Sequence, residues 1–137
     1  MQAITDLDEI KRIVDEVNME CASLAMKTVD SRGQQKMEYW LPEKLKQLMI
    51  EEFKRPDGQK THIAIVKYFN PSGNQTWWFS ELDERGDEHI ADFFGLAEVF
   101  EKEYGYTNLR ELREVRCRFG LFIERDYHFT PRPLSEC

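Results

Sequence analysis

Residues 61–82, THIAIVKYFNPSGNQTWWFSEL, carry the clearest secondary-structure signal in the chain. The first part, THIAIVKYF (61–69), is rich in β-branched and aromatic residues, which favour strands. NPSGN (70–74) has the composition of a tight turn. QTWWFSEL (75–82) again has the composition of a strand. The segment therefore predicts an antiparallel β-hairpin.

The sequence after this hairpin extends the predicted sheet. IADFFGLAEVF (90–100) predicts a third strand, in which Gly95 indicates a bulge or a close approach of two backbones. No strand is predicted at Tyr104-Gly105-Tyr106, and LFIERDYHF (121–129) predicts the last strand. Thr130-Pro131-Arg132-Pro133 cannot continue a sheet ladder, because proline has no N–H, so we expect it to close the domain.

Two helices are predicted before the hairpin. The first is entered through Thr5 with Asp8 as its capping partner, and apolar residues follow at spacings of three and four: Leu7, Ile10, Val14, Val17, Cys21 and Leu24. The second starts at Pro42 and ends at Pro56-Asp57-Gly58. Its apolar face contains Leu41, Leu45, Leu48, Met49 and Phe53.

A short helix is predicted before the last strand. Asn108 caps it with Glu111 three residues on, and it ends near Phe119-Gly120. Its inner face contains Leu109, Leu112 and Val115.

This order of elements predicts an α+β fold, in which N-terminal helices pack on a small antiparallel sheet with one inserted short helix. The 137 residues fit one domain, residues 1–137, with a helical extension (1–36) and an α+β core (37–137). The apolar seam of residues 7–24 leaves two interpretations: the helix packs on its own domain, or it pairs with the same helix of a second copy in a homodimer.

The composition predicts a cytoplasmic protein. No window approaches the ~18 consecutive apolar residues of a membrane span. The N-terminus lacks the apolar core of a signal peptide. Cys21, Cys117 and Cys137 form no CxxC pair, so reduced thiols are expected.

The net charge of −7 is concentrated around one segment. Only Arg85 balances the acidic residues there, which are Glu81, Asp83, Glu84, Asp87, Glu88 and Asp92. Such a surface repels phosphate backbones and favours a basic protein partner. Nucleic-acid binding is therefore disfavoured, although an alternative surface exists for it. That surface consists of an arginine row beside an exposed Trp78, with Arg110, Arg113, Arg116 and Arg118. In the competing interpretation Trp77 and Trp78 are both buried, on opposite faces of the sheet.

No nucleotide-binding loop, nucleophile elbow or zinc-protease motif occurs in the sequence. We therefore expect no enzyme and no cofactor. A metal-dependent enzyme remains an alternative that depends on residue type alone, with His62, His89, His128, Glu124 and Asp126 as its groups.

Several segments of the chain match one family in order. They are VKYFNP (66–71), TWWFSELD (76–83), DFFGLA (92–97), EYGYTNLRELREVR (103–116) and GLFIERDYHFTPRPLSE (120–136). Over residues 63–135 the sequence resembles the uncharacterised domain-of-unknown-function family 2958. The resemblance implies a small α+β domain carried by plasmids, phages and other mobile elements. It implies no activity and supplies no catalytic residue.

These observations support one leading hypothesis. The chain is expected to be a non-enzymatic accessory protein of a mobile genetic element. It would bind, and by binding inhibit, a host or element-encoded protein through its acidic surface.

Overall fold

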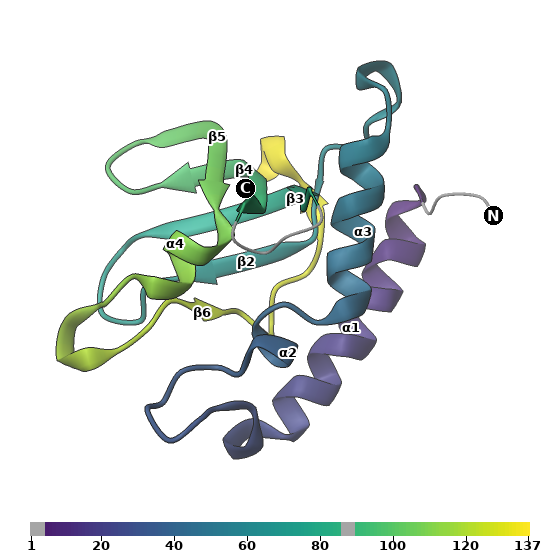
Figure 1. The fold of residues 1–137 in the computed structure, drawn as a ribbon. Coiled ribbons are helices and arrows are strands. Elements are labelled where there is room, and N and C mark those ends of the chain that lie inside the picture. Colours follow the sequence, from purple (N-terminus) through teal and green to yellow (C-terminus); the bar gives the residue numbers. More distant parts are fainter. Residues whose placement is uncertain (1–4, 86–89) are drawn as a thin grey trace.

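The computed structural model describes residues 5–85 and 90–137, and Figure 1 shows their arrangement. The helices are α1 (Leu7–Ser23), α2 (Met37–Trp40), α3 (Glu43–Lys54) and α4 (Leu109–Glu114). The strands are β1 (Ile63–Ala64), β2 (Val66–Phe69), β3 (Thr76–Asp83), β4 (Asp92–Glu98), β5 (Lys102–Asn108), β6 (Glu124–Arg125) and β7 (Arg132–Pro133). Short 3-10 turns lie at Ala25–Thr28, Asp57–Gln59, Arg118–Gly120 and Leu134–Glu136. The predicted α+β class is confirmed.

The main sheet has the strand order β5-β4-β3-β2-β6, and each neighbouring pair is antiparallel. The predicted hairpin is confirmed as β2–β3, with Phe69 opposite Thr76 at its turn. In that turn the side chain of Asn70 accepts a hydrogen bond from the backbone N–H of Ser72 at 2.8 Å. β1 and β7 form a separate two-stranded sheet.

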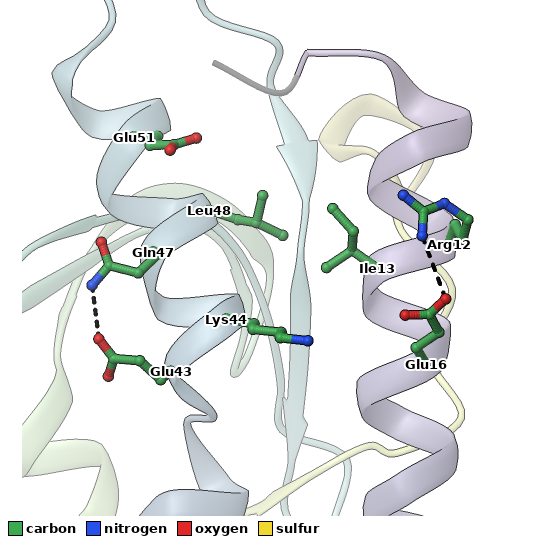
Figure 2. Close-up of a pocket in the computed structure, with 8 residues that line it drawn as sticks. All are labelled: Arg12, Ile13, Glu16, Glu43, Lys44, Gln47, Leu48 and Glu51. Carbon is green, nitrogen blue, oxygen red and sulfur yellow. Dashed lines mark hydrogen bonds and ion pairs between the residues drawn. The ribbon is translucent and has the colours of Figure 1, made fainter. Parts of the chain in front are cut away.

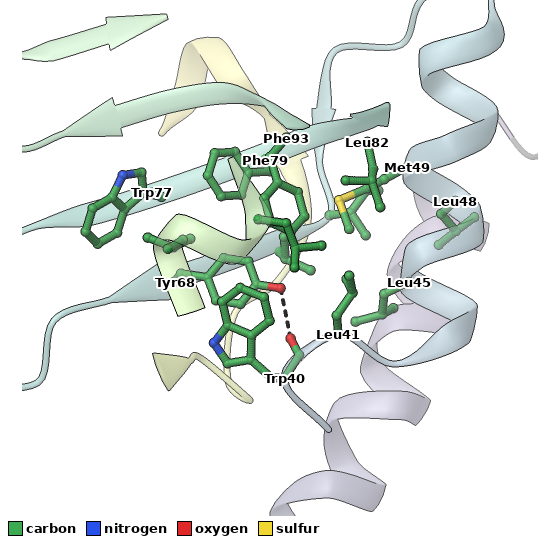
Figure 3. Close-up of a cluster of buried hydrophobic side chains, with 14 of the residues drawn as sticks. Trp40, Leu41, Leu45, Leu48, Met49, Tyr68, Trp77, Phe79, Leu82 and Phe93 are labelled. Carbon is green, nitrogen blue, oxygen red and sulfur yellow. Dashed lines mark hydrogen bonds between the residues drawn. The ribbon is translucent and has the colours of Figure 1, made fainter. Parts of the chain in front are cut away.

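Aromatic side chains form the centre of the core, where α3 packs on the sheet (Figure 3). Phe79 and Phe93 stack with ring centroids 4.4 Å apart. Tyr68 lies 4.3 Å from Trp40, and its hydroxyl donates to the Trp40 carbonyl oxygen at 2.8 Å. This hydrogen bond satisfies the only polar atom that the buried tyrosine ring brings into the core.

The close approach predicted at Gly95 is confirmed. Gly95 lies opposite Phe79, where the register of β3 with β4 shifts between Phe79 and Glu81. A Cβ atom at Gly95 would lie 2.0 Å from the carbonyl oxygen of Trp78. Only glycine therefore allows the two central strands to approach this closely.

The N-terminal helix packs on the chain's own core, beside α3 (Figure 1). Ile10, Val14 and Cys21 are buried on its inner side. The predicted cap was wrong, because the side chain of Asp6, rather than Thr5, accepts a hydrogen bond from the N–H of Asp8. The middle of the apolar seam is thus covered within one chain, and pairing between two copies stays a prediction.

A buried arginine joins this helix to the rest of the domain. Arg125 is 2% exposed, and its guanidinium donates to the side chains of Asn18 and Cys21 on α1. Its Nε donates to the carbonyl oxygen of Tyr39 at 2.9 Å. The side-chain amide of Gln35 bonds to the Arg125 backbone in both directions, at 2.7 and 3.1 Å. Helix, connector and sheet therefore meet around one side chain.

Two predicted elements are shorter than expected. α4 ends at Glu114, and the following Val115 has extended backbone and is 39% exposed, so it does not belong to the inner face. Of the predicted strand 121–129, only Glu124–Arg125 pairs with β2. The chain turns at Asp126, whose side chain accepts a hydrogen bond from the N–H of His128 at 2.8 Å.

Two predictions missed strands. Arg132–Pro133 pairs with β1, although the prolines were expected to end the sheet. An edge position tolerates proline, because its missing N–H need not face a partner strand. Lys102–Asn108 forms β5 at the other end of the main sheet, where no strand was predicted. Among the described residues, no helix is long and apolar enough to cross a bilayer.

Candidate functional site

Neighbouring cations neutralise part of the predicted acidic surface. Glu81 is 6% exposed, and its carboxylate lies 3.0 Å from Lys60 Nζ. The Glu84 carboxylate lies 3.0 Å from Lys46 Nζ. The sequence predicted Glu81 on an exposed acidic surface, but the residue is buried. The reason is that β3 places it next to Lys60, in the connector that follows α3.

Arg85 pairs with two more of these carboxylates. Its Nε lies 2.7 Å from Asp83, and its Nη2 lies 3.9 Å from Asp92. Asp87 and Glu88 lie outside the described residues. In the described part of the segment, each acidic side chain faces a cation, so the segment offers less free negative charge than its composition indicates.

The predicted arginine row is not one helical face, because α4 ends before two of its members. Arg110 donates from Nε to Glu114 at 3.0 Å. Arg113 donates to the carbonyl oxygen of Gln35 at 2.7 Å, and its guanidinium lies 5.0 Å from the centre of a Trp40 ring. Arg113 thus joins α4 to the connector that contains Gln35, whereas Arg110 forms an exposed ion pair within α4.

The other two arginines precede an exposed aromatic residue in the segment after α4. Arg116 lies over the ring of Phe122 at 4.3 Å. Arg118 begins the turn that contains Phe119, which is 92% exposed. The φ angle of Phe119 is 61°, in the left-handed region that an aromatic residue rarely adopts. This short segment, rather than the row, combines cations with an accessible ring.

Trp78 is not exposed, which corrects the predicted nucleic-acid surface. It is 6% exposed and packs with Leu96, Phe129 and Leu134 on the face of the sheet away from α3. Trp77 is 8% exposed and belongs to the main core. The interpretation in which both tryptophans are buried on opposite faces is the one that the structure has.

The candidate metal ligands gather into no cluster within residues 5–85 and 90–137, where no group of three or more His, Cys, Asp or Glu side chains could hold an ion. His89 lies outside these residues. Asp126 lies 3.7 Å from Lys67 Nζ, and burial raises the pKa of the Glu124 carboxyl. His62 and His128 contribute to no such group.

A groove of about 380 Å³ runs between α1 and α3 (Figure 2). It is lined by Arg12, Ile13, Glu16, Glu43, Lys44, Gln47, Leu48 and Glu51. On α1, Arg12 donates to Glu16 at 3.4 Å. On α3, Gln47 donates to Glu43 at 2.8 Å. Both signs of charge line the groove, with Arg12 and Lys44 beside Glu16, Glu43 and Glu51, so it favours no one class of ligand.

The hairpin formed by β4 and β5 combines highly exposed aromatic side chains with carboxylates. We define the hairpin surface as Glu98, Val99, Phe100, Glu101, Glu103, Tyr104 and Tyr106. Phe100 is 97% exposed, Tyr106 68% and Tyr104 58%. Water therefore contacts most of three aromatic rings that are near in sequence.

The carboxylates of the hairpin surface are not neutralised by neighbours. Within the described part of the chain, no ion pair involves Glu98, Glu101 or Glu103. Lys102 lies among them in sequence, but its Nζ bonds to the Cys137 carbonyl oxygen at 2.8 Å and lies 5.5 Å from the Trp78 ring. The exposed negative charge of this region therefore belongs to the hairpin.

A hollow of about 390 Å³ adjoins β5, where the C-terminal segment meets the sheet. It is lined by His62, Phe94, Tyr104, Pro133, Leu134 and Ser135. His62 has a φ of 54°, and its N–H donates to the buried carboxylate of Glu52 at 2.7 Å, which holds this strained backbone in place. The ring of Phe94 lies 5.0 Å from that of Tyr106, so aromatic side chains continue from the hollow along β5.

Sequence reasoning missed this surface because it predicted no strand at Tyr104-Gly105-Tyr106. The signal was an alternation with period two, since Lys102, Tyr104 and Tyr106 lie on one side of β5 and Glu103 and Gly105 on the other. The alternation was not recognised because Gly105 separates the two tyrosines and glycine is unfavourable in strands.

The family model described as "Protein of unknown function (DUF2958)" matches residues 40–136. The match begins at the last residue of α2 and leaves α1 outside it. No curated protein and no solved structure matches the chain.

Proposed function

The chain belongs to the DUF2958 family, for which no function is assigned, and from that premise we propose that it acts without catalysis, by binding a partner protein through its hairpin surface. This proposal keeps the protein-binding class that the sequence favoured. It moves the contact from the paired acidic segment before β4 to the β4–β5 hairpin.

The observation that carries the proposal is the exposure of Phe100, Tyr104 and Tyr106 on one hairpin. Aromatic side chains are enriched at the centres of protein interfaces, because they bury a large area at a small entropic cost. A protein that binds nothing there would leave these rings in water.

The charge of the same surface supports a basic partner. Glu98, Glu101 and Glu103 lie on the same hairpin as the rings and form no ion pair with another described residue, and the whole chain carries a net charge of −7. Carboxylates at the rim of an interface speed the encounter with a positive surface and lose influence as salt rises. Basic surfaces that read nucleic acid have this character. The mobile-element setting implied by the resemblance would make such a host surface a target for inhibition.

Affinity capture from the native cells tests this proposal with a matched pair of variants. Phe100→Gln removes the most exposed ring of the hairpin, and Met19→Gln removes an apolar side chain of α1 that is 71% exposed. We expect a protein that the wild type and Met19→Gln retain and that Phe100→Gln loses. A capture profile that is identical for the two variants would show that the hairpin is not the binding surface.

A second candidate function is contact with single-stranded nucleic acid through the segment after α4. The observation that favours it is the exposed ring of Phe119, which directly follows Arg118 in the sequence and comes three residues after Arg116. A base can stack on such a ring while the cations face phosphates. A gel shift at low salt tests it, and binding should weaken steeply as salt rises. No shift, or a shift that Phe119→Ala leaves unchanged, would remove this candidate.

A further inference from the structure

We infer that the free edge of β5 accepts an extended segment of the partner as an additional strand of the main sheet. The inference depends on the proposed function, because it names the mode by which the hairpin surface binds. It specifies a segment that alternates apolar and basic side chains.

The backbone of β5 is suited to this addition. β5 spans seven residues, Lys102–Asn108, pairs in unbroken register with β4, and ends the strand order that residues 5–85 and 90–137 form. It contains no proline, so each of its residues has an N–H group. The strand at the opposite edge, β6, has only two residues. A long, regular edge without a partner is a template for another strand.

One side of β5 fits apolar side chains of the incoming strand. Tyr104 and Tyr106 point to this side, opposite Leu96 and Phe94 on β4. The hollow lined by Tyr104, Phe94 and Leu134 adjoins the same side. Alternate residues of an added strand would lie over the tyrosine rings, and one of them would reach the hollow.

The other side of β5 fits long basic side chains. Glu103 points to this side and forms no ion pair within the described residues. A Cβ atom at Gly105 would meet nothing within 4 Å, so space is open next to the Glu103 carboxylate. A lysine or arginine of the added strand could cross Gly105 and reach Glu103.

The charge of the chain disfavours a second copy as the occupant. Antiparallel pairing of β5 with itself would bring two hairpins together, each with Glu101 and Glu103, from chains that each carry a net charge of −7. Two chains of the same large net charge repel each other. The negative charge of the chain attracts a basic segment of another protein, whereas it repels a second copy.

The test uses a synthetic peptide that alternates lysine and valine as its probe. Two peptides serve as controls: one of the same length that alternates glutamate and valine, and the lysine–valine peptide with alternate backbone nitrogens methylated. Fluorescence anisotropy measures binding to the full chain, and amide hydrogen exchange reports which strand is protected. N-methylation removes backbone hydrogen bonds without changing charge, so it should weaken binding about tenfold or more.

We expect the unmethylated lysine–valine peptide to bind and to slow exchange in β5 but not in α1. Glu103→Lys should weaken this binding about fivefold. Glu38→Lys, which changes an exposed residue of α2 by the same charge, should leave it unchanged. Equal binding of the methylated peptide, absence of protection in β5, or no binding of the lysine–valine peptide would overturn strand addition. Protection of β5 that rises with protein concentration alone would instead assign the edge to a second copy.

These outcomes separate the inference from the proposed function. A partner that is lost with Phe100→Gln but leaves the β5 amides unprotected would refute strand addition and leave the binding surface in place. A partner that Phe100→Gln binds as well as the wild type does would refute the proposal that the hairpin surface is the binding site.

Discussion

Replacing Gly95 with alanine is expected to destabilise the protein far more than the same change at Gly105, although the two residues are paired neighbours in the sheet. The Cβ atom of alanine at position 95 would lie 2.0 Å from the carbonyl oxygen of Trp78 and 2.8 Å from the Cα atom of Phe79. At position 105 it would meet nothing within 4 Å.

The size of the effect follows from what would have to move. Carbon atoms pack best at separations of about 3.5–4.0 Å, so the new methyl group would overlap the backbone of β3 by more than 1 Å. A flexible side chain could rotate away, but these contacts are backbone atoms of a central strand. Overfilling a packed core lowers the free energy of unfolding by roughly 1–3 kcal/mol. A clash with backbone atoms is expected to cost about 3 kcal/mol or more, because the backbone cannot move aside as a side chain can. We therefore expect Gly95→Ala to lower the free energy of unfolding by about 3 kcal/mol or more.

Urea denaturation followed by tryptophan fluorescence measures both variants. The free energy of unfolding of Gly105→Ala should be equal to that of the wild type or higher by up to about 1 kcal/mol, because alanine restricts the unfolded chain more than glycine does. If Gly95→Ala also lies within about 1 kcal/mol of the wild type, the close approach of β3 and β4 is not a constraint and the reasoning is refuted.

Three further variants test other parts of the fold. Val14→Asp places a charge at a position of α1 that is 0% exposed, and should lower the free energy of unfolding by about 4 kcal/mol in denaturation while light scattering shows the wild-type mass. Asn108→Ala removes the side chain that accepts a hydrogen bond from the N–H of Glu111, and should lower thermal stability by about 1 kcal/mol; no change would show that the cap is dispensable. Burial opposes ionisation of Glu52, but hydrogen bonds from Thr61, Arg55 and His62 outweigh it and lower the pKa of that carboxyl below its usual 4.5. Its contribution is therefore present above pH 4.5 and is lost as the pH falls through the lowered pKa, so Glu52→Gln should reduce the loss of stability in acid, and an unchanged acid profile would contradict this.

Local composition predicted the elements whose own residues determine them. The β2–β3 hairpin follows from β-branched and aromatic residues on either side of the Asn70–Asn74 turn, and Asn108 caps α4 as expected. Glycine at position 95 indicated a close approach, and the approach is present. In each case the decisive contacts lie within a few residues or between adjacent strands.

Contacts between distant segments were beyond sequence reasoning. Nothing local shows that Arg125 turns inward to meet Asn18 and Cys21, more than a hundred residues earlier. The same limit applies to the acidic segment. Composition located the carboxylates, but the pairing of Glu81 with Lys60 depends on how β3 lies against the connector after α3. Charge read from a sequence overstates the charge that a surface presents.

The candidate surface was missed for a different reason. Tyr104 and Tyr106 are separated by Gly105, and glycine is unfavourable in strands, so β5 had the composition of a connection. Pairing with β4 overrides that preference. The acidic character of the region around residues 98–103 was visible in the sequence, but its combination with exposed rings depends on the hairpin.

Photocrosslinking from position 100 in the native cells tests the binding surface most directly. A photoreactive phenylalanine analogue in place of Phe100, which is 97% exposed, reports any protein that covers the hairpin surface. The same analogue in place of Met19, which is 71% exposed on α1, is the control. Our account predicts one discrete crosslinked protein from position 100 that position 19 does not give. Crosslinks that are the same from both positions, or absent from position 100, would contradict it.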